Sequence, residues 1–224
     1  MNYQIVKEQL QELIESLRES LTKQNGGQSM SAPITNIKIE ENQASRMEEL
    51  TVELEKLNPN PQPLRNAINL LNGAWKLEYS TAREIRVLDS LPLGLQVGQV
   101  FQVINVAQAE FFNLAQVKHP WKIVSGGVKV TARFEAHLDN SGLPNQRINV
   151  YFDKRYLAID EILGISTPML NPLNVAPANN PKGRVPSLDI TYLDENFRIG
   201  RGGDQGLFIL HKTDDIHNVN SINF

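Results

Sequence analysis

The chain has 224 residues, 22 lysines and arginines against 25 aspartates and glutamates, a formal net charge of −3, and no cysteine. The lack of cysteine excludes disulfides, thiolate nucleophiles and cysteine-ligated zinc or iron–sulfur sites. The near-neutral charge argues against nucleic acid as a partner, because neutralising phosphates requires a basic surface.

Residues 1–72 carry the acidic excess, with 7 basic and 10 acidic residues, and are predicted to be helical. Apolar residues between Val6 and Leu21 recur at steps of three and four, so they share one helix face, and Asn25-Gly26-Gly27 is expected to end that helix. Met1–Lys23 contains four glutamates and no continuous apolar run. This composition argues against a secretory signal or a transit peptide.

A second helix is predicted over about Glu40–Leu57, or from a later start if Ser45-x-x-Glu48 forms a capping box. A proline run, Asn58–Pro63, ends it, and Leu64–Leu71 is expected to form a short third helix. We expect these helices to pack on the rest of the protein. Membrane-surface helices are the alternative, but they usually have a basic polar face, and this one is acidic.

From Gly73 onward the hydrophobic period changes to two. Apolar and polar residues alternate through Val128–Leu138 and Ile148–Phe152, which is typical of half-buried strands. Gly126-Gly127 and Asp139–Gly142 are predicted turns. Further predicted strands are Trp75–Thr81, Glu84–Leu88, Gln99–Val106, Glu110–Val117, Trp121–Ser125, Leu188–Leu193, Phe197–Arg201 and Gly206–Lys212. This series favours an antiparallel β-barrel or sandwich over residues 73–215, followed by a tail at 216–224.

One long segment interrupts the strands. Ile159–Ser187 contains five of the twelve prolines, and loops of this length in compact domains are usually lids or disordered. Its apolar residues, Met169 among them, favour a lid, and both alternatives stay open.

No catalytic motif is recognisable, and the four histidines have unrelated spacings. The densest polar cluster is expected to form turns and ion pairs at the barrel rim rather than an acid–base site; it consists of Asp189, Asp194, Glu195, Arg198, Arg201 and Asp204. We therefore expect a protein that is not an enzyme and that has no metal and no cofactor.

With no catalytic motif, the apolar interior of the predicted barrel is the feature most able to carry a function. A barrel of eight or more strands can enclose one small ligand between its inward side chains. The sequence does not decide between a hollow barrel and one filled by its own side chains. The expected ligand-binding residues are Trp75, Tyr79, Phe101, Val130, Phe134, Val150 and Phe152.

Three stretches resemble the plastid lipid-associated protein (PAP/fibrillin) family over roughly residues 45–212. Leu70–Thr81, which the proline run Asn58–Pro63 precedes, resembles the start of that domain. Leu91–Leu95 leading into Gly98–Gln102 also fits, and Leu188–Gly202 with Gly206–Leu210 is close to the C-terminal motif. Gly73-x-Trp75 with a late arginine additionally resembles the lipocalin pattern, in which the Trp packs under an Arg at the closed barrel end. Arg198 or Arg201 would take that role.

The resemblance implies a lipocalin-like barrel that binds a hydrophobic isoprenoid or lipid, such as a carotenoid, a prenylquinone or an acyl lipid, at thylakoid membranes or lipid globules. It implies a cyanobacterial protein, cytoplasmic and peripheral to the thylakoid, or a mature plastid form. The expected role is photoprotection or membrane maintenance.

Two alternatives are retained. A solid barrel could serve as an adaptor that docks on a membrane enzyme or photosynthetic complex through residues 1–72. An enzyme or chromophore chaperone using Asp189, Asp194, Arg198 and Arg201 is less favoured.

Overall fold

The computed structural model describes residues 2–27, 30–121, 123–178 and 183–214. Its first element is α1 (Tyr3–Gln24), capped by Asn2, whose side chain accepts a hydrogen bond from the backbone N–H of Gln4 at 3.1 Å. The helix ends at Asn25, and Gly26 follows with φ at +67°, a conformation that glycine adopts without strain. The predicted stop is confirmed.

α2 (Glu41–Lys56) begins close to the first predicted boundary and not at Ser45, which lies inside the helix. The capping box is formed by Glu40 and Gln43, with the Glu40 N–H donating to Gln43 Oε1 at 3.0 Å. The single helix predicted over 64–71 is divided into α3 (Pro63–Asn66) and the 3₁₀ turn η2 (Ile68–Leu71). None of the helices in the described ranges has the length and apolar character needed to cross a membrane.

The first strand, β1 (Ile34–Thr35), precedes the barrel in the chain and is followed by the 3₁₀ turn η1 (Asn36–Lys38). The strands after residue 72 are β2 (Gly73–Ser80), β3 (Gln96–Asn105), β4 (Glu110–Lys118), β5 (Val124–Leu138), β6 (Pro144–Ile162), β7 (Ile165–Ser166), β8 (Asn174–Pro177), β9 (Ser187–Leu193), β10 (Phe197–Gly202) and β11 (Leu207–Thr213).

Eight of these strands close into an antiparallel barrel in the order β2-β11-β10-β9-β6-β5-β4-β3, with β3 pairing back to β2. β1 adds to β2 in parallel, and β7 and β8 add to β6. The mainly β, lipocalin-like architecture predicted from the sequence is therefore confirmed.

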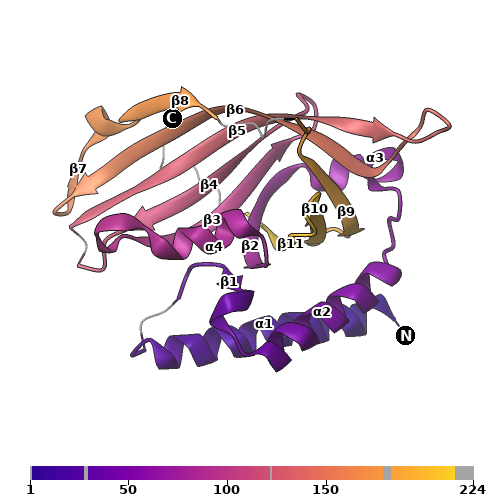
Figure 1. Ribbon diagram of the computed structural model, residues 1–224, viewed down its shortest axis with the longest axis horizontal. Coiled ribbons are helices and arrows are strands. Elements are labelled where there is room, and N and C mark those ends of the chain that lie inside the picture. Colours follow the sequence, from indigo (N-terminus) through magenta and orange to yellow (C-terminus); the bar gives the residue numbers. More distant parts are fainter. Residues whose placement is uncertain (1, 28–29, 122, 179–182, 215–224) are drawn as a thin grey trace.

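The barrel is closed at one end and open at the other. β2 pairs with β3 only through residues 73–76, and β6 pairs with β9 only through residues 147–149. Beyond these seams β3, β4, β5, β6 and β8 continue as a long sheet that outreaches β9–β11 (Figure 1). The two halves thus separate into a mouth.

A helical segment lies at that mouth, beneath the long sheet (Figure 1). It consists of α4 (Arg83–Arg86), η3 (Val87–Ser90) and η4 (Pro92–Gly94), and is called the capping segment below. Its Ile85, Leu88 and Leu91 are partly buried against the barrel core. The strand predicted over 84–88 is therefore wrong, because five residues cannot distinguish a strand from a helical turn by periodicity.

Three further sequence predictions need correction. The strand predicted over Trp121–Ser125 is wrong at its start, because β5 begins at Val124 and Trp121 lies in the loop before it. Gly126 and Gly127 lie inside β5 and not in a turn, because β6 approaches so closely that a Cβ at position 126 would collide with the Ala158 carbonyl. The long segment after Ile159 is not a lid in its described part: β6 continues to Ile162, and β7, η5 (Pro168–Leu170) and β8 fold back along it. Residues 179–182 of that segment lie outside the described residues.

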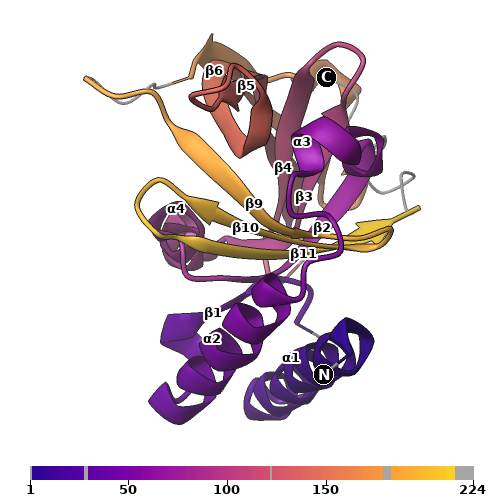
Figure 2. The ribbon, with the colours of Figure 1, turned by 90° about the vertical axis from the view of Figure 1, so that its right-hand side faces the viewer.

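α1 and α2 lie side by side against the outer surface of β2, β9, β10 and β11 (Figure 2). Their predicted apolar stripes are buried on strand residues such as Tyr79, Tyr192 and Phe197. Arg18 ties α1 to the barrel through Glu78 at 2.7 Å, and Arg201 binds Glu48 and Glu55 of α2 at 2.7 and 2.8 Å. The helices therefore pack on the barrel, as predicted.

Candidate functional site

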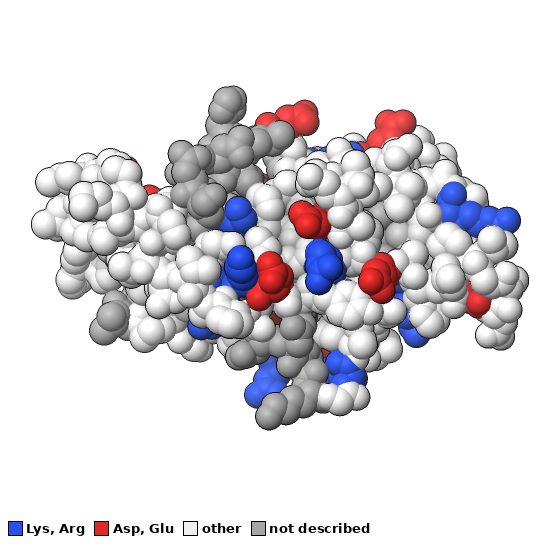
Figure 3. All heavy atoms as spheres, turned by 90° about the horizontal axis from the view of Figure 1, so that it is seen from above, with Lys and Arg blue, Asp and Glu red and all other residues white. Residues whose placement is uncertain are grey.

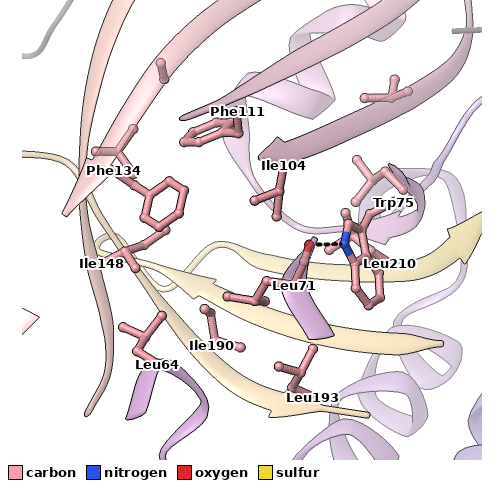
Figure 4. Close-up of a cluster of buried hydrophobic side chains, with 14 of the residues drawn as sticks. Leu64, Leu71, Trp75, Ile104, Phe111, Phe134, Ile148, Ile190, Leu193 and Leu210 are labelled. Atoms are coloured by element: carbon pink, nitrogen blue, oxygen red, sulfur yellow. Dashed lines mark hydrogen bonds between the residues drawn. The ribbon is translucent and has the colours of Figure 1, made fainter. Parts of the chain in front are cut away.

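The interior of the barrel is largely apolar. Trp75 of β2, Ile104 of β3, Phe134 of β5 and Ile190 of β9 point into one cluster (Figure 4). Leu71 closes the end of the barrel next to Trp75 and accepts the indole N–H hydrogen bond at 2.8 Å. This end is sealed by packed side chains.

Arg198 of β10 is the charged group inside this core, with 2 % of its surface exposed. Its guanidinium carbon lies 4.9 Å from the Trp75 ring centre, and its Nη2 donates to Gln102 Oε1 at 2.5 Å. Its Nε has no hydrogen-bond partner, and no carboxylate of the described residues forms an ion pair with it. Burial lowers the pKa of Arg198 to about 9, so the side chain is still a cation at neutral pH.

A small void adjoins this arginine. Its volume is about 30 Å³, and its lining includes Arg198, Gln102, Phe134, Val150 and Ile190. A void of this size holds roughly one water-sized group. The closed end is therefore filled except for this small void, whose lining is apolar apart from Arg198 and Gln102.

Lys212 and Gly73 complete the surroundings of Trp75. Lys212 Nζ lies 5.2 Å from the indole ring centre and donates to the Leu70 carbonyl at 3.0 Å. Gly73 has φ at +110°, a conformation that side chains rarely adopt, and a Cβ there would lie 3.5 Å from Lys212. The residues named for barrel closure thus lie together, apart from Arg201, which is on the side facing α2.

Some of the residues predicted to line a ligand site lie in the barrel core, and others lie outside it. Trp75, Phe134 and Val150 belong to the barrel core, and Phe152 packs against it half-buried. Val130 is half-buried on β5. The remaining two do not join them: Tyr79 lies under the helices, and Phe101 packs in a separate cluster with Leu114 and Ala158.

Gln102 was missed by the sequence analysis. It lies on β3 opposite Asn113, and its Nε2 donates to Asn113 Oδ1 at 2.9 Å while its Oε1 accepts from Arg198. The sequence does contain a signal for Gln102: it is a polar residue at an inward-facing position between Val100 and Ile104.

The polar cluster considered for acid–base chemistry does not come together. Asp189 forms a two-pronged ion pair with Arg147 at 2.6 and 2.7 Å, across the short β6–β9 seam. Arg201 is bound by α2, and Arg198 lies inside the barrel. Asp194 is engaged by Lys7 of α1 at 2.6 Å and by the Tyr192 hydroxyl at 2.7 Å. Each residue thus serves a different structural contact.

Replacing Asp194 by asparagine is expected to lower the free energy of unfolding by about 2 kcal/mol, because Lys7 loses a mostly buried partner. Burial by itself would raise the pKa of Asp194, but hydrogen bonds from Lys7, Tyr192 and the backbone of Asn196 hold it below the ordinary 3.8. The stabilisation is therefore present above about pH 4 and is lost as the pH falls through the lowered pKa. Urea unfolding from pH 7 to pH 3 should give a flatter stability profile for Asp194→Asn than for the parent, and parallel profiles would contradict this.

An open hollow lies beside α2, where the helix meets η1 and the end of β2. Its volume is about 790 Å³, and its lining includes Glu41, Glu48, Glu49, Glu53 and Tyr79. The hollow is acidic and widely open to solvent, so it resembles a docking surface for a basic partner more than a small-molecule site.

Comparison with known proteins gives one consistent family. The PAP_fibrillin family model matches residues 11–211. Plastid-lipid-associated protein 6, chloroplastic, of Arabidopsis thaliana is 30 % identical over 166 residues, covering 67 % of this chain and 56 % of the relative. Probable plastid-lipid-associated protein 3, chloroplastic, of the same plant is 31 % identical over 198 residues, covering 72 % and 50 %.

A third relative is the chromoplast-specific carotenoid-associated protein of Cucumis sativus, 29 % identical over 199 residues, covering 73 % of this chain and 59 % of the relative. The chain thus spans between half and three-fifths of the length of these relatives. No solved structure matches the chain significantly. Since the family model covers most of the sequence, the chain belongs to the PAP/fibrillin family.

Proposed function

We propose that this protein binds a hydrophobic isoprenoid or lipid, without catalysing a reaction on it, at the membranes or lipid globules of a plastid or a cyanobacterium. Photoprotection or membrane maintenance is the role that follows. The observation that carries the proposal is the barrel itself: a closed ring of eight strands with a largely apolar interior, in which the cation Arg198 is buried and lines a small void. The names of the plant relatives, which refer to plastid lipids and to carotenoids, support the ligand class and the compartment.

The geometry supports one way for the ligand to lie. A polar end, such as a carbonyl or carboxylate oxygen, is placed at the small void that Arg198 and Gln102 line, since the Arg198 Nε has no protein partner. The apolar chain then runs toward the mouth and replaces contacts that Ile85, Leu88 and Leu91 make with the core. These three side chains are only partly buried, so displacing the capping segment costs less than displacing a fully buried part of the wall.

The direct test is mass spectrometry of organic extracts from protein purified without detergent from a photosynthetic host. We expect a stoichiometric isoprenoid or lipid that is missing from a mock purification. A clean extract from folded protein would contradict the proposal.

A matched pair of variants locates the ligand. Phe152→Asp places a charge against the barrel core, whereas Phe112→Asp places one on the opposite face of the same sheet, in the cluster of Phe101 and Leu114. Both parent side chains are half-buried. Phe152→Asp should lower the bound lipid at least tenfold, while Phe112→Asp should retain it, in proteins whose circular dichroism shows that they are folded. Equal lipid content in the two variants would remove the ligand from the barrel.

The second candidate function is an adaptor that docks a protein partner through residues 1–72, and the acidic hollow on α2 favours it. Deleting the helices does not test it, because the deletion would expose Tyr79, Tyr192 and Phe197, which are at most 1 % exposed. Reversing charge with Glu49→Lys and Glu53→Lys should leave the fold intact, because neither side chain is buried. Loss of membrane localisation in that variant, with lipid content unchanged, would support the adaptor.

A further inference from the structure

Exposed apolar side chains gather at the end of the long sheet that outreaches β9–β11. They lie in three segments, the β4–β5 loop, the β6–β7 turn and η5, and four of them are largely exposed: Trp121 at 81 %, Leu163 at 72 %, Ile165 at 70 % and Met169 at 94 %. Together with the half-exposed Ile123 and Ile162, these residues are called the apolar tip. Side chains of this kind are normally buried, so a group of them at one place marks an interaction surface.

Backbone hydrogen bonds hold the three segments next to one another. The Leu163 N–H donates to the Ile123 carbonyl at 2.8 Å, which joins the β6–β7 turn to the β4–β5 loop. Ile162 pairs with Val124 at the start of β5. The Thr167 N–H donates to the Asp160 carbonyl at 2.8 Å and so brings η5 back to the same end. These bonds therefore hold the three segments of the apolar tip at one end of the sheet.

Charge is nearly absent from this end of the molecule. The sequence has no charged residue from Ile162 to Pro181, and Lys122 is the only one between His119 and Val124. Seen from above, the end of the molecule that carries the tip, on the left, is almost free of charged side chains, whereas both signs are scattered over the rest of that face (Figure 3).

We propose that the apolar tip inserts into the interfacial layer of a lipid surface. A protein partner would normally meet a broad patch of about 800 Å² with a polar rim and several hydrogen bonds. The tip is instead a narrow set of turns at the protruding end of a sheet, and its backbone hydrogen bonds are largely internal. Tryptophan beside aliphatic residues is the composition preferred at the boundary between headgroups and acyl chains.

The tip and the barrel mouth are at the same end of the protein. The His119 ring lies 5.5 Å from the Trp121 ring, edge to face, and a Cβ at Gly94 of the capping segment would lie 3.7 Å from His119 Nε2. Insertion of Trp121 thus brings the capping segment to the lipid surface. If the proposed function holds, lipid passes between the membrane and the barrel without crossing water. This consequence rests on the proposed function, whereas insertion of the tip does not.

Tryptophan fluorescence can report the insertion of Trp121, since the second tryptophan, Trp75, is fully buried and should not respond to vesicles. With phosphatidylcholine vesicles the emission should shift to shorter wavelength, and brominated acyl chains should quench it. Leu163→Asp with Ile165→Asp should weaken vesicle binding at least tenfold. Because the side chains that form the apolar tip carry no charge themselves, binding by the parent should change less than twofold between about 0.05 and 0.5 M salt.

Leu138→Asp is the matched control. Leu138 is 55 % exposed at the β5–β6 turn, at the opposite end of the barrel, and this variant should bind vesicles like the parent. The proposal is overturned if the parent does not bind, if the double variant binds as well as the parent, or if Leu138→Asp weakens binding equally. Self-association that the double variant loses, without vesicle binding, would overturn it in favour of a contact between copies.

The same variants separate this proposal from the proposed function. Lipid content after detergent-free purification is expected to survive in the double variant if the barrel is the ligand site. A parent that binds vesicles but carries no lipid contradicts the proposed function alone, and one that carries lipid but does not bind vesicles contradicts the tip alone.

Discussion

Trp75→Ala is expected to lower the free energy of unfolding by about 3–5 kcal/mol, the range for removing a large, fully buried aromatic side chain. Trp75 is 0 % exposed, and its indole N–H is satisfied by the Leu71 carbonyl at 2.8 Å. The ring also covers the guanidinium of Arg198, so alanine leaves a cavity next to a buried cation. The measurement is urea unfolding followed by circular dichroism, which does not depend on the tryptophan that is removed.

Trp121→Ala is the control for this prediction. The indole of Trp121 is 81 % exposed, so its loss should change stability by no more than about 0.5 kcal/mol. A loss below about 1.5 kcal/mol for Trp75→Ala, or equal losses for the two variants, would mean that the closed end does not hold the barrel together.

Much of the architecture was predictable, because hydrophobic periodicity follows directly from which side chains are buried. The change from a period of 3.6 to one of 2 at Gly73 coincides with the start of β2, and the stripe on α1 is the set of residues buried on the barrel. The pairing of Trp75 with a late arginine followed from the resemblance to lipocalins, and the structure selects Arg198 from the two arginines named.

The side of the sheet that each residue faces was less predictable, and irregular pairing explains why. Between β2 and β11 the register shifts at Ile209 and Leu210, so that Leu77 faces the barrel core while Tyr79 faces the helices. Simple alternation would have kept both on one face. No local pattern in the sequence marks such a bulge.

The occupancy of the barrel was beyond sequence reasoning for a different reason. Phe134 and Val150 have the same alternation whether they fill a core or line a cavity. The remaining space is reduced to about 30 Å³ by side chains from distant parts of the chain, such as Leu71, Ile104 and Ile190. A void of this kind depends on how all eight strands pack together.

Arg198→Met should retain or raise the free energy of unfolding while it lowers the amount of bound lipid. Methionine retains contact with Trp75 and removes a buried cation whose Nε has no partner, so the variant is expected to be as stable as the parent or up to about 2 kcal/mol more stable. Arg198→Ala, which leaves a cavity, should instead cost about 3 kcal/mol. Both are measured by urea unfolding at pH 7.5.

The pH dependence of this difference has a definite sign. Burial lowers the pKa of Arg198 to about 9 in the folded protein, below its ordinary 12.5. The penalty for burying the cation is therefore fully present below pH 9 and is relieved as the pH rises above it. The advantage of Arg198→Met over the parent should shrink between pH 9 and pH 11. A constant advantage would show that desolvation of the guanidinium is not its source.

Bound lipid should change in the opposite direction to stability. If Arg198 receives the polar end of the ligand, Arg198→Met loses that contact and should carry at least tenfold less lipid than the parent. A variant that is stable and still fully loaded would restrict Arg198 to covering Trp75. A variant that is stable and empty would mean that the chain retains a destabilising buried charge because the ligand requires it, since covering Trp75 alone does not need a cation.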